Sequence, residues 1–73
     1  MNVGDIVTFT RDEAIFYGKI CHISNGDLCG IENPIVFENG EYYRDLFNRG
    51  EFKDSLRLVS DEEWLCVRLH VEV

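Results

Sequence analysis

The side chains of this chain that could bind a metal ion or act as nucleophiles are three cysteines and two histidines: Cys21, His22, Cys29, Cys66 and His70. A structural zinc site needs four such ligands, two of them held together by a C-x-x-C turn or a comparable knuckle. No such spacing occurs in the sequence. An odd number of cysteines, in a chain that opens without an apolar signal segment, also argues against a secreted disulfide framework. We expect no metal, no cofactor and a cytoplasmic location.

A nucleophilic cysteine paired with a histidine is also disfavoured. Cys21 and His22 are neighbours on a predicted strand, so their side chains point to opposite faces. His22 lies opposite Cys29 only if the intervening loop has two residues, and a cross-strand pair is then the simpler interpretation. A chain of 73 residues also has little room for a cleft that shifts a carboxyl pKa upward. The sequence therefore indicates a protein that is not an enzyme.

The charge is strongly acidic, with fourteen acidic and seven basic residues and a net charge of −7. Such a surface repels nucleic acid and anionic membranes and favours basic protein partners. No apolar run approaches the roughly 20 residues that span a bilayer. The acids either keep the protein soluble or form rows of charge that compete for a basic nucleic-acid channel; the residues concerned are Asp12, Glu13, Glu38, Glu41, Asp61, Glu62, Glu63 and Glu72.

Aromatic side chains supply a second kind of candidate contact. Aromatic residues fill the core of a small domain, and in some small barrels they line a peptide groove. Tyr42 and Tyr43 are adjacent on a predicted strand, so one of the two faces outward, and we expect that one to contact a partner. Phe47 belongs to the same group of aromatics. The predicted partner-binding residues are Tyr17, Tyr42, Tyr43, Trp64, Glu38, Glu41, Asp61, Glu62 and Glu63.

The element that must position these groups is a hairpin over residues 16–32. Asn25-Gly26 separates two runs rich in apolar residues, and both turn residues tolerate the positive φ of a tight turn. A two-residue loop places Cys21 opposite Gly30, and a three-residue loop places it opposite Ile31. Neither register sets Cys21 opposite Cys29, and both cysteines are expected to be buried small side chains.

The segments around this hairpin predict further strands. Alternation over residues 1–9 indicates a first strand, and the charged run at residues 10–14 indicates a solvated loop. Pro34 cannot donate a ladder hydrogen bond, so a strand break or a sheet edge is expected at Asn33-Pro34.

Residues 35–43 repeat the hairpin pattern around Asn39-Gly40. That turn sets Phe37 opposite Tyr42 and Glu38 opposite Glu41. Beyond it, Gly50 indicates either a third turn or the cap of a single helical turn at residues 45–48. A final short strand is expected within residues 52–59.

The end of the chain carries two conflicting patterns. Ser60 and Glu63 have the spacing of a helix capping box, which predicts a short helix near residues 60–66. The apolar residues that follow alternate at period two, which predicts a strand: Leu65, Val67, Leu69, Val71 and Val73. A free tail would expose these side chains to water. We therefore expect residues 65–73 to pair either with the barrel or with a second copy of the chain as a homodimer.

Five or six short strands joined by glycine turns predict an all-β domain over residues 1–73, closed as a small antiparallel barrel. The segments at residues 3–7 and 17–23 resemble the opening strands of SH3-like barrels, in which a VGD-hydrophobic-V strand precedes a G-K-I-x-x-I strand. The resemblance covers residues 3–32. It implies an SH3-like barrel and a binding function, and it provides no catalytic residue.

Residues 54–63 are similar to the strand-to-helix ending of small SH3-like proteins of phages and mobile elements, although Leu58 stands where those proteins carry proline. Together with the charge, this resemblance implies an inhibitor that occupies a basic surface of a host nucleic-acid-binding protein. The alternative is a structural or assembly subunit that binds a protein through an aromatic and β-edge patch. Steep salt dependence of binding favours the first hypothesis, and insensitivity to salt favours the second.

Overall fold

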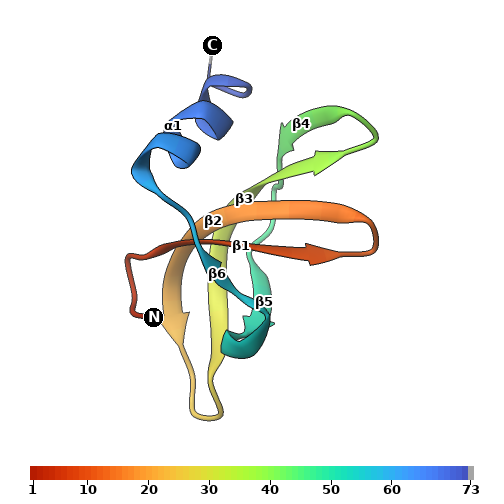
Figure 1. Ribbon diagram of the computed structural model, residues 1–73. Coiled ribbons are helices and arrows are strands. Elements are labelled where there is room, and N and C mark those ends of the chain that lie inside the picture. The colour runs from red at the N-terminus through yellow and green to blue at the C-terminus, as the bar shows by residue number, and fades with distance from the viewer. Residues whose placement is uncertain (73) are drawn as a thin grey trace.

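The computed structural model describes residues 1–72 and contains six strands, one short 3-10 helix and one α-helix (Figure 1). In chain order they are β1 (Ile6–Arg11), β2 (Ala14–Ile23), β3 (Leu28–Glu38), β4 (Glu41–Arg44), β5 (Arg49–Phe52), η1 (Lys53–Ser55), β6 (Arg57–Leu58) and α1 (Asp61–Leu69).

All strand pairs are antiparallel. The strands are ordered β4-β3-β2-β1-β6, and β5 pairs with the first half of β3. The sheet curls on itself, while α1 and the β3–β4 hairpin extend beyond one end of the curled part (Figure 1). The predicted all-β class, with a small barrel-like sheet and a short helix near residue 60, is confirmed.

The hairpin between β1 and β2 is tighter than predicted. Arg11 pairs with Ala14, so the turn consists of Asp12 and Glu13 alone. Both turn residues have positive φ, at 53° and 67°, which matches the twist of two-residue hairpin turns. The predicted solvated loop at residues 10–14 is therefore wrong, and β1 begins at Ile6 rather than at the start of the chain.

The hairpin at Asn25-Gly26 is confirmed, with a three-residue loop. The Ser24 backbone N–H donates to the Leu28 carbonyl at 2.9 Å, and Ile23 lies opposite Cys29. Farther from the turn, a register shift between Ile20 and His22 leaves Cys21 in a bulge.

The three-residue loop and the bulge correct three expectations. Cys21 lies opposite neither Gly30 nor Ile31, because Gly30 pairs with His22 and Ile31 pairs with Ile20. His22 does not face Cys29. Cys29 is buried as expected, whereas Cys21 is exposed, because it follows the buried Ile20 and points to the other face of β2.

Pro34 does not end its strand. β3 continues through it, and the pairing with β2 shifts by one residue between Glu32 and Ile35. A bulge at this point removes the need for a ladder donor at the proline. On its other side β3 changes partner here, from β5 to β4. The predicted strand break is therefore a bend at which the sheet switches neighbours.

The β3–β4 hairpin has the predicted register. Phe37 pairs with Tyr42 and Glu38 pairs with Glu41. The rings of Phe37 and Tyr42 lie 4.6 Å apart between centroids. The alternation of the two strands and the Asn39-Gly40 turn were sufficient to predict this element.

Residues 45–50 form neither the third turn nor the capped helical turn that the sequence predicted. Gly50 is neither a turn nor a helix cap, since it pairs with Gly30 inside β5. The predicted strand within residues 52–59 is divided among the end of β5, η1 and the two-residue β6. Leu56 is buried, whereas Leu58 is exposed.

At the end of the chain the helix pattern prevails over the strand pattern. Ser60 Oγ accepts a hydrogen bond from the Glu63 backbone N–H at 3.2 Å, and α1 then continues to Leu69. The strand predicted from residue 65 is wrong, because a capped helix that buries Val67 satisfies its own backbone without a sheet partner. The tail therefore pairs neither with the barrel nor with a second copy as a strand over residues 65–72; Val73 lies outside the described residues.

The barrel core is a single apolar cluster on the inner face of the sheet. It consists of Val7, Phe9, Ala14, Phe16, Ile20, Cys29, Ile31, Val36 and Leu56. Phe9 and Phe16 stack across β1 and β2, with ring centroids 4.8 Å apart. Within residues 1–72, no helix has the length and apolar character needed to cross a membrane.

Candidate functional site

The outer face of the sheet carries a second layer of side chains, directed away from the barrel core. Ile35 neighbours Val36, a core residue, so it points to the opposite face. Tyr17 pairs with Ile35 and shares this face. Two residues farther along β2, Lys19 lies there too and pairs with Glu32. This face is mixed, with aromatic, aliphatic and charged groups side by side.

Helix α1 covers part of this outer face. The His70 ring, directly after the helix, stacks on Tyr42 with centroids 4.1 Å apart. Glu72 Oε1 accepts from Arg44 Nη2 at 2.8 Å. Val67 is buried but does not belong to the barrel core cluster. The helix is thus held to β4 at its C-terminal end by one stacking contact and one exposed ion pair.

An open groove of about 610 Å³ lies between α1 and the sheet. Its lining comes from β2, β3, β4, the β4–β5 loop and the end of the chain, through the residues Lys19, Glu32, Asn33, Arg44, Asp45, Leu46, Trp64, Arg68 and Glu72. The Arg68 guanidinium lies over the Trp64 indole, 5.6 Å from the ring centroid to Cζ. The groove therefore combines several charges with one aromatic wall.

Arg68 carries an unusual donor. Its Nε is shielded from water and has no hydrogen-bond partner among residues 1–72. A buried donor without a partner costs about 1–3 kcal/mol. The side chain is nevertheless kept in place by its contact with Trp64. Arg68 is therefore a donor that gains from the arrival of an acceptor.

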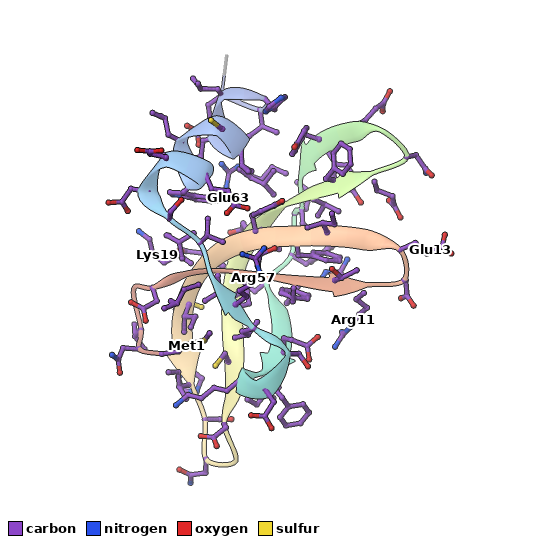
Figure 2. The ribbon with its side chains drawn as sticks, viewed as in Figure 1. Met1, Arg11, Glu13, Lys19, Arg57 and Glu63 are labelled. Carbon is purple, nitrogen blue, oxygen red and sulfur yellow. The ribbon has the colours of Figure 1, made fainter. Side chains whose placement is uncertain are left out.

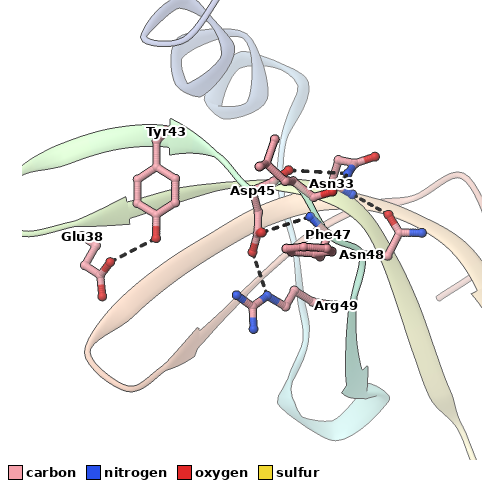
Figure 3. A network of polar contacts seen from close by, with 8 residues as sticks. Asn33, Glu38, Tyr43, Asp45, Phe47, Asn48 and Arg49 are labelled. Carbon is pink, nitrogen blue, oxygen red and sulfur yellow. Dashed lines mark hydrogen bonds and ion pairs between the residues drawn. The ribbon is translucent and has the colours of Figure 1, made fainter.

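The β4–β5 loop is fixed by a polar network (Figure 3). Buried Asp45 accepts from Arg49 Nε at 2.7 Å and from the Phe47 backbone N–H at 3.1 Å. Asn33 lies at the bulge in β3, and its Nδ2 donates to the Leu46 carbonyl at 3.0 Å. Its backbone N–H donates to Asn48 Oδ1 at 3.0 Å. The network ties the loop to the point where β3 changes partner.

Burial by itself would raise the pKa of the Asp45 carboxyl. The hydrogen bonds from Arg49 and from the Phe47 N–H outweigh that effect, so the pKa is held below its ordinary value of 3.8. Asp45 is therefore an ionised, structural carboxylate whose two oxygens are already occupied.

A different region of the surface gathers unpaired acids. Ile15 pairs with Phe37, so the β1–β2 turn and the β3–β4 turn lie next to each other at one end of the sheet. Figure 1 shows the two turns on the same side of the molecule, and Figure 2 shows Glu13 at the tip of the first. We call this region the acidic end; it consists of Asp12, Glu13, Glu38 and Glu41.

Tyr43 stands beside the acidic end. It is the exposed member of the Tyr42–Tyr43 pair, as one of the two had to be. Its hydroxyl donates to Glu38 Oε1 at 3.0 Å (Figure 3), and this hydrogen bond is the main cause that raises the pKa of Tyr43. The next loop exposes two large apolar side chains, Leu46 at 83% and Phe47 at 72%.

The predicted partner-binding residues thus fall into separate groups. Tyr43, Glu38 and Glu41 lie at the acidic end. The groups gathered on the helix side of the sheet or on α1 itself are Tyr17, Tyr42, Trp64, Glu63, Asp61 and Glu62.

Tyr17 shows how close some helix-side groups are. Its pKa is raised first by burial and then by the negative charge of Glu63 and by Tyr42, while Arg57 opposes the shift. Asp61 and Glu62 are exposed in the first turn of α1. The structure therefore does not bring the predicted set into one surface.

Sequence reasoning missed the basic residues of the groove. Lys19, Arg44 and Arg68 are far apart in the chain, and no motif connects them. One signal was available: Trp64, Val67 and Val71 have the i, i+3, i+7 spacing of a helix face, and all three are at least half-buried. That spacing would have placed Arg68 beside them, toward the sheet.

Among residues 1–72 no three His, Cys, Asp or Glu side chains are arranged to hold a metal ion. All three cysteines are free thiols, and Cys21 and Cys66 are exposed. Comparison of the chain with protein-family models, curated proteins and solved structures gives no match.

Proposed function

We propose that this protein is a non-enzymatic, cytoplasmic binding module that engages a protein partner with a basic surface through its acidic end. The observation that supports the proposal is the convergence of four carboxylates from two neighbouring turns, beside the exposed Tyr43. Tyrosine at the edge of a charged patch is a common contact residue, because it combines apolar area with a polar tip.

The distribution of ion pairs supports the acidic end as the site that contacts a basic partner. Among the residues that the structure describes, four ion pairs neutralise basic residues elsewhere: Arg11–Glu51, Arg44–Glu72, Arg49–Asp45 and Lys53–Asp27. None of the four carboxylates of the acidic end takes part in these pairs. Their charge is therefore not neutralised by any of these ion pairs, and it accelerates association with a basic partner.

The finer proposal is that the partner is a host nucleic-acid-binding protein and that the module, of a phage or mobile-element type, inhibits it by covering its basic channel. Carboxylates in rows imitate the charge of a nucleic-acid backbone. Inhibition of this kind is competitive, so added DNA or RNA displaces the module from its partner.

A direct test uses titration calorimetry with an oligo-arginine peptide as the basic probe. The double variant Glu38→Gln/Glu41→Gln removes two negative charges from the acidic end, which changes the net charge of the chain from −7 to −5, and it should weaken binding at least fivefold. Asp54→Asn/Glu62→Gln changes the charge equally but away from this region and should have less than half that effect. Equal losses of affinity in the two variants would show that binding depends only on the net charge of the protein, and this result would contradict the proposal.

A second candidate function rests on Leu46 and Phe47, whose exposure marks an apolar contact surface beside the edge strand β4. In this proposal the protein is an assembly subunit that binds another protein through an aromatic and β-edge patch. Homodimerisation through residues 65–73 would here use the exposed Leu65 and Leu69 of α1. Binding that survives high salt and is lost in Phe47→Ser would favour this candidate.

A further inference from the structure

The groove beneath α1 is lined by three basic and three acidic side chains, although the chain as a whole has twice as many acidic as basic residues. Three of the seven basic residues line it, namely Lys19, Arg44 and Arg68, although the net charge is −7. Its volume of about 610 Å³ lies within the roughly 300–1,000 Å³ typical of small-molecule sites. None of its lining residues belongs to the acidic end.

The charges in the groove do not all remain available. Arg44 is engaged by Glu72 and by the Asn33 carbonyl, and both oxygens of Asp45 accept hydrogen bonds within the loop. Lys19 and Arg68 have no ion pair among the described residues, and they face one uncommitted acid, Glu32. Among the lining groups that take part in none of the four ion pairs, two cations therefore face one carboxylate.

The two uncommitted cations suit a carboxylate. A guanidinium donates to both oxygens of a carboxylate in a fork geometry, and an ammonium adds a third, charge-assisted bond. The Arg68 Nε, buried and unpartnered, becomes satisfied when the side chain turns toward such an acceptor. Trp64 and Leu46 supply apolar surface for the rest of a ligand.

We propose that this groove binds a small organic monocarboxylate, with the carboxylate on Arg68 and Lys19 and the apolar body against Trp64 and Leu46. A ligand with two or more negative charges is rejected, because the uncommitted Glu32 also lines the groove and repels the additional charge.

The single tryptophan of the chain makes the test direct, since all tryptophan fluorescence comes from Trp64 in the groove. The probe is N-acetyl-phenylalanine, which has one carboxylate and one apolar ring. Its amide, in which the carboxylate is neutralised, is the matched control, and inorganic phosphate is the multiply charged competitor. We expect a saturable fluorescence change with the acid, at least fivefold weaker binding of the amide, and no displacement by equimolar phosphate.

Two variants assign the contact. Arg68→Gln should weaken binding of the probe about tenfold, the loss expected for one charge-assisted bond, and Lys19→Gln, at an exposed position, should weaken it by a smaller factor. Arg57→Gln removes an exposed cation that does not line the groove and should leave binding unchanged.

The circular dichroism spectrum of each variant verifies its fold, and Lys19→Gln keeps the proposal testable if Arg68→Gln fails to fold. Equal affinity for acid and amide would show that the groove recognises only the ring, and no fluorescence change up to millimolar probe would show that it binds no such ligand. Either result would overturn the proposal.

Discussion

The two faces of the central strands are built on different principles. The inner face is an apolar cluster in which Val7, Ile20 and Ile31 are fully buried. The outer face buries Ile35 and Val67 but otherwise relies on a ring stack, an exposed ion pair and half-buried charges. Burial of apolar area stabilises the first, whereas the second gains little from contacts that water can replace.

This difference indicates where function can reside. A close-packed core admits no ligand without a loss of stability. The outer face already includes an open groove and an unpartnered donor, so a ligand there adds contacts rather than displacing them. The experiments below test whether the two faces are as unequal as their packing indicates.

The largest effect is expected in the inner face. Ile20→Ala removes a fully buried side chain from the core cluster and should lower the free energy of unfolding by about 2–5 kcal/mol, from lost burial and the cavity left behind. Chemical denaturation measures this loss. The exposed Leu58→Ala is the control and should change stability by less than about 0.5 kcal/mol.

The second largest loss of stability is expected in the β4–β5 loop, at Asp45. Asp45→Asn weakens the charge-assisted bond from Arg49 and should cost about 1.5–3 kcal/mol at neutral pH. Because the pKa of Asp45 is held below 3.8 in the folded state, its stabilisation is fully present above that pH and is lost as the pH falls through the lowered value.

Urea denaturation as a function of pH checks this sign. The parent protein should lose stability on acidification below pH 3.8 more steeply than the Asn variant. Asp54→Asn, at an exposed carboxyl of η1, serves as the control. Parallel profiles for parent and Asp45→Asn would show that this carboxylate does not stabilise the fold.

A smaller loss is expected under the helix. Val67→Ala should lower stability by about 1–2 kcal/mol and should accelerate hydrogen exchange in α1 more than in β1 to β3, because the helix opens locally. Leu69→Ala, on the exposed side of the same helix, should do neither. If Val67→Ala costs as much as Ile20→Ala and opens both regions together, the two faces form one core and the comparison fails.

The smallest effect should come from the helix start. Ser60→Ala removes the acceptor of the Glu63 N–H and should cost about 1 kcal/mol, detected as a lower thermal midpoint. Ser55→Ala, at the end of η1, is the matched control. Unchanged midpoints in both variants would mean that the capping bond contributes nothing to holding α1 in place.

Local sequence was sufficient for the elements that local chemistry controls. The two Asn-Gly turns, the opposition of Phe37 to Tyr42, and the Ser60 cap were all predicted and are confirmed. In each case the turn or cap residues act within four positions of one another, so no distant partner alters the outcome. The all-β class followed from the same alternation and turns.

Tertiary structure decided what depends on distant partners. Period-two alternation predicted a strand from residue 65, but no sheet edge receives it, and the residues instead continue a capped helix that buries Val67. β3 continues through Pro34 because a bulge removes the need for a backbone donor at the proline. The bulge lies where β3 changes its partner from β5 to β4. The groove joins Lys19, Arg44 and Arg68 from three separate elements. No spacing in the sequence encodes that meeting, because it arises only when the end of the chain lies beside β4, as the Tyr42–His70 stack and the Arg44–Glu72 pair show.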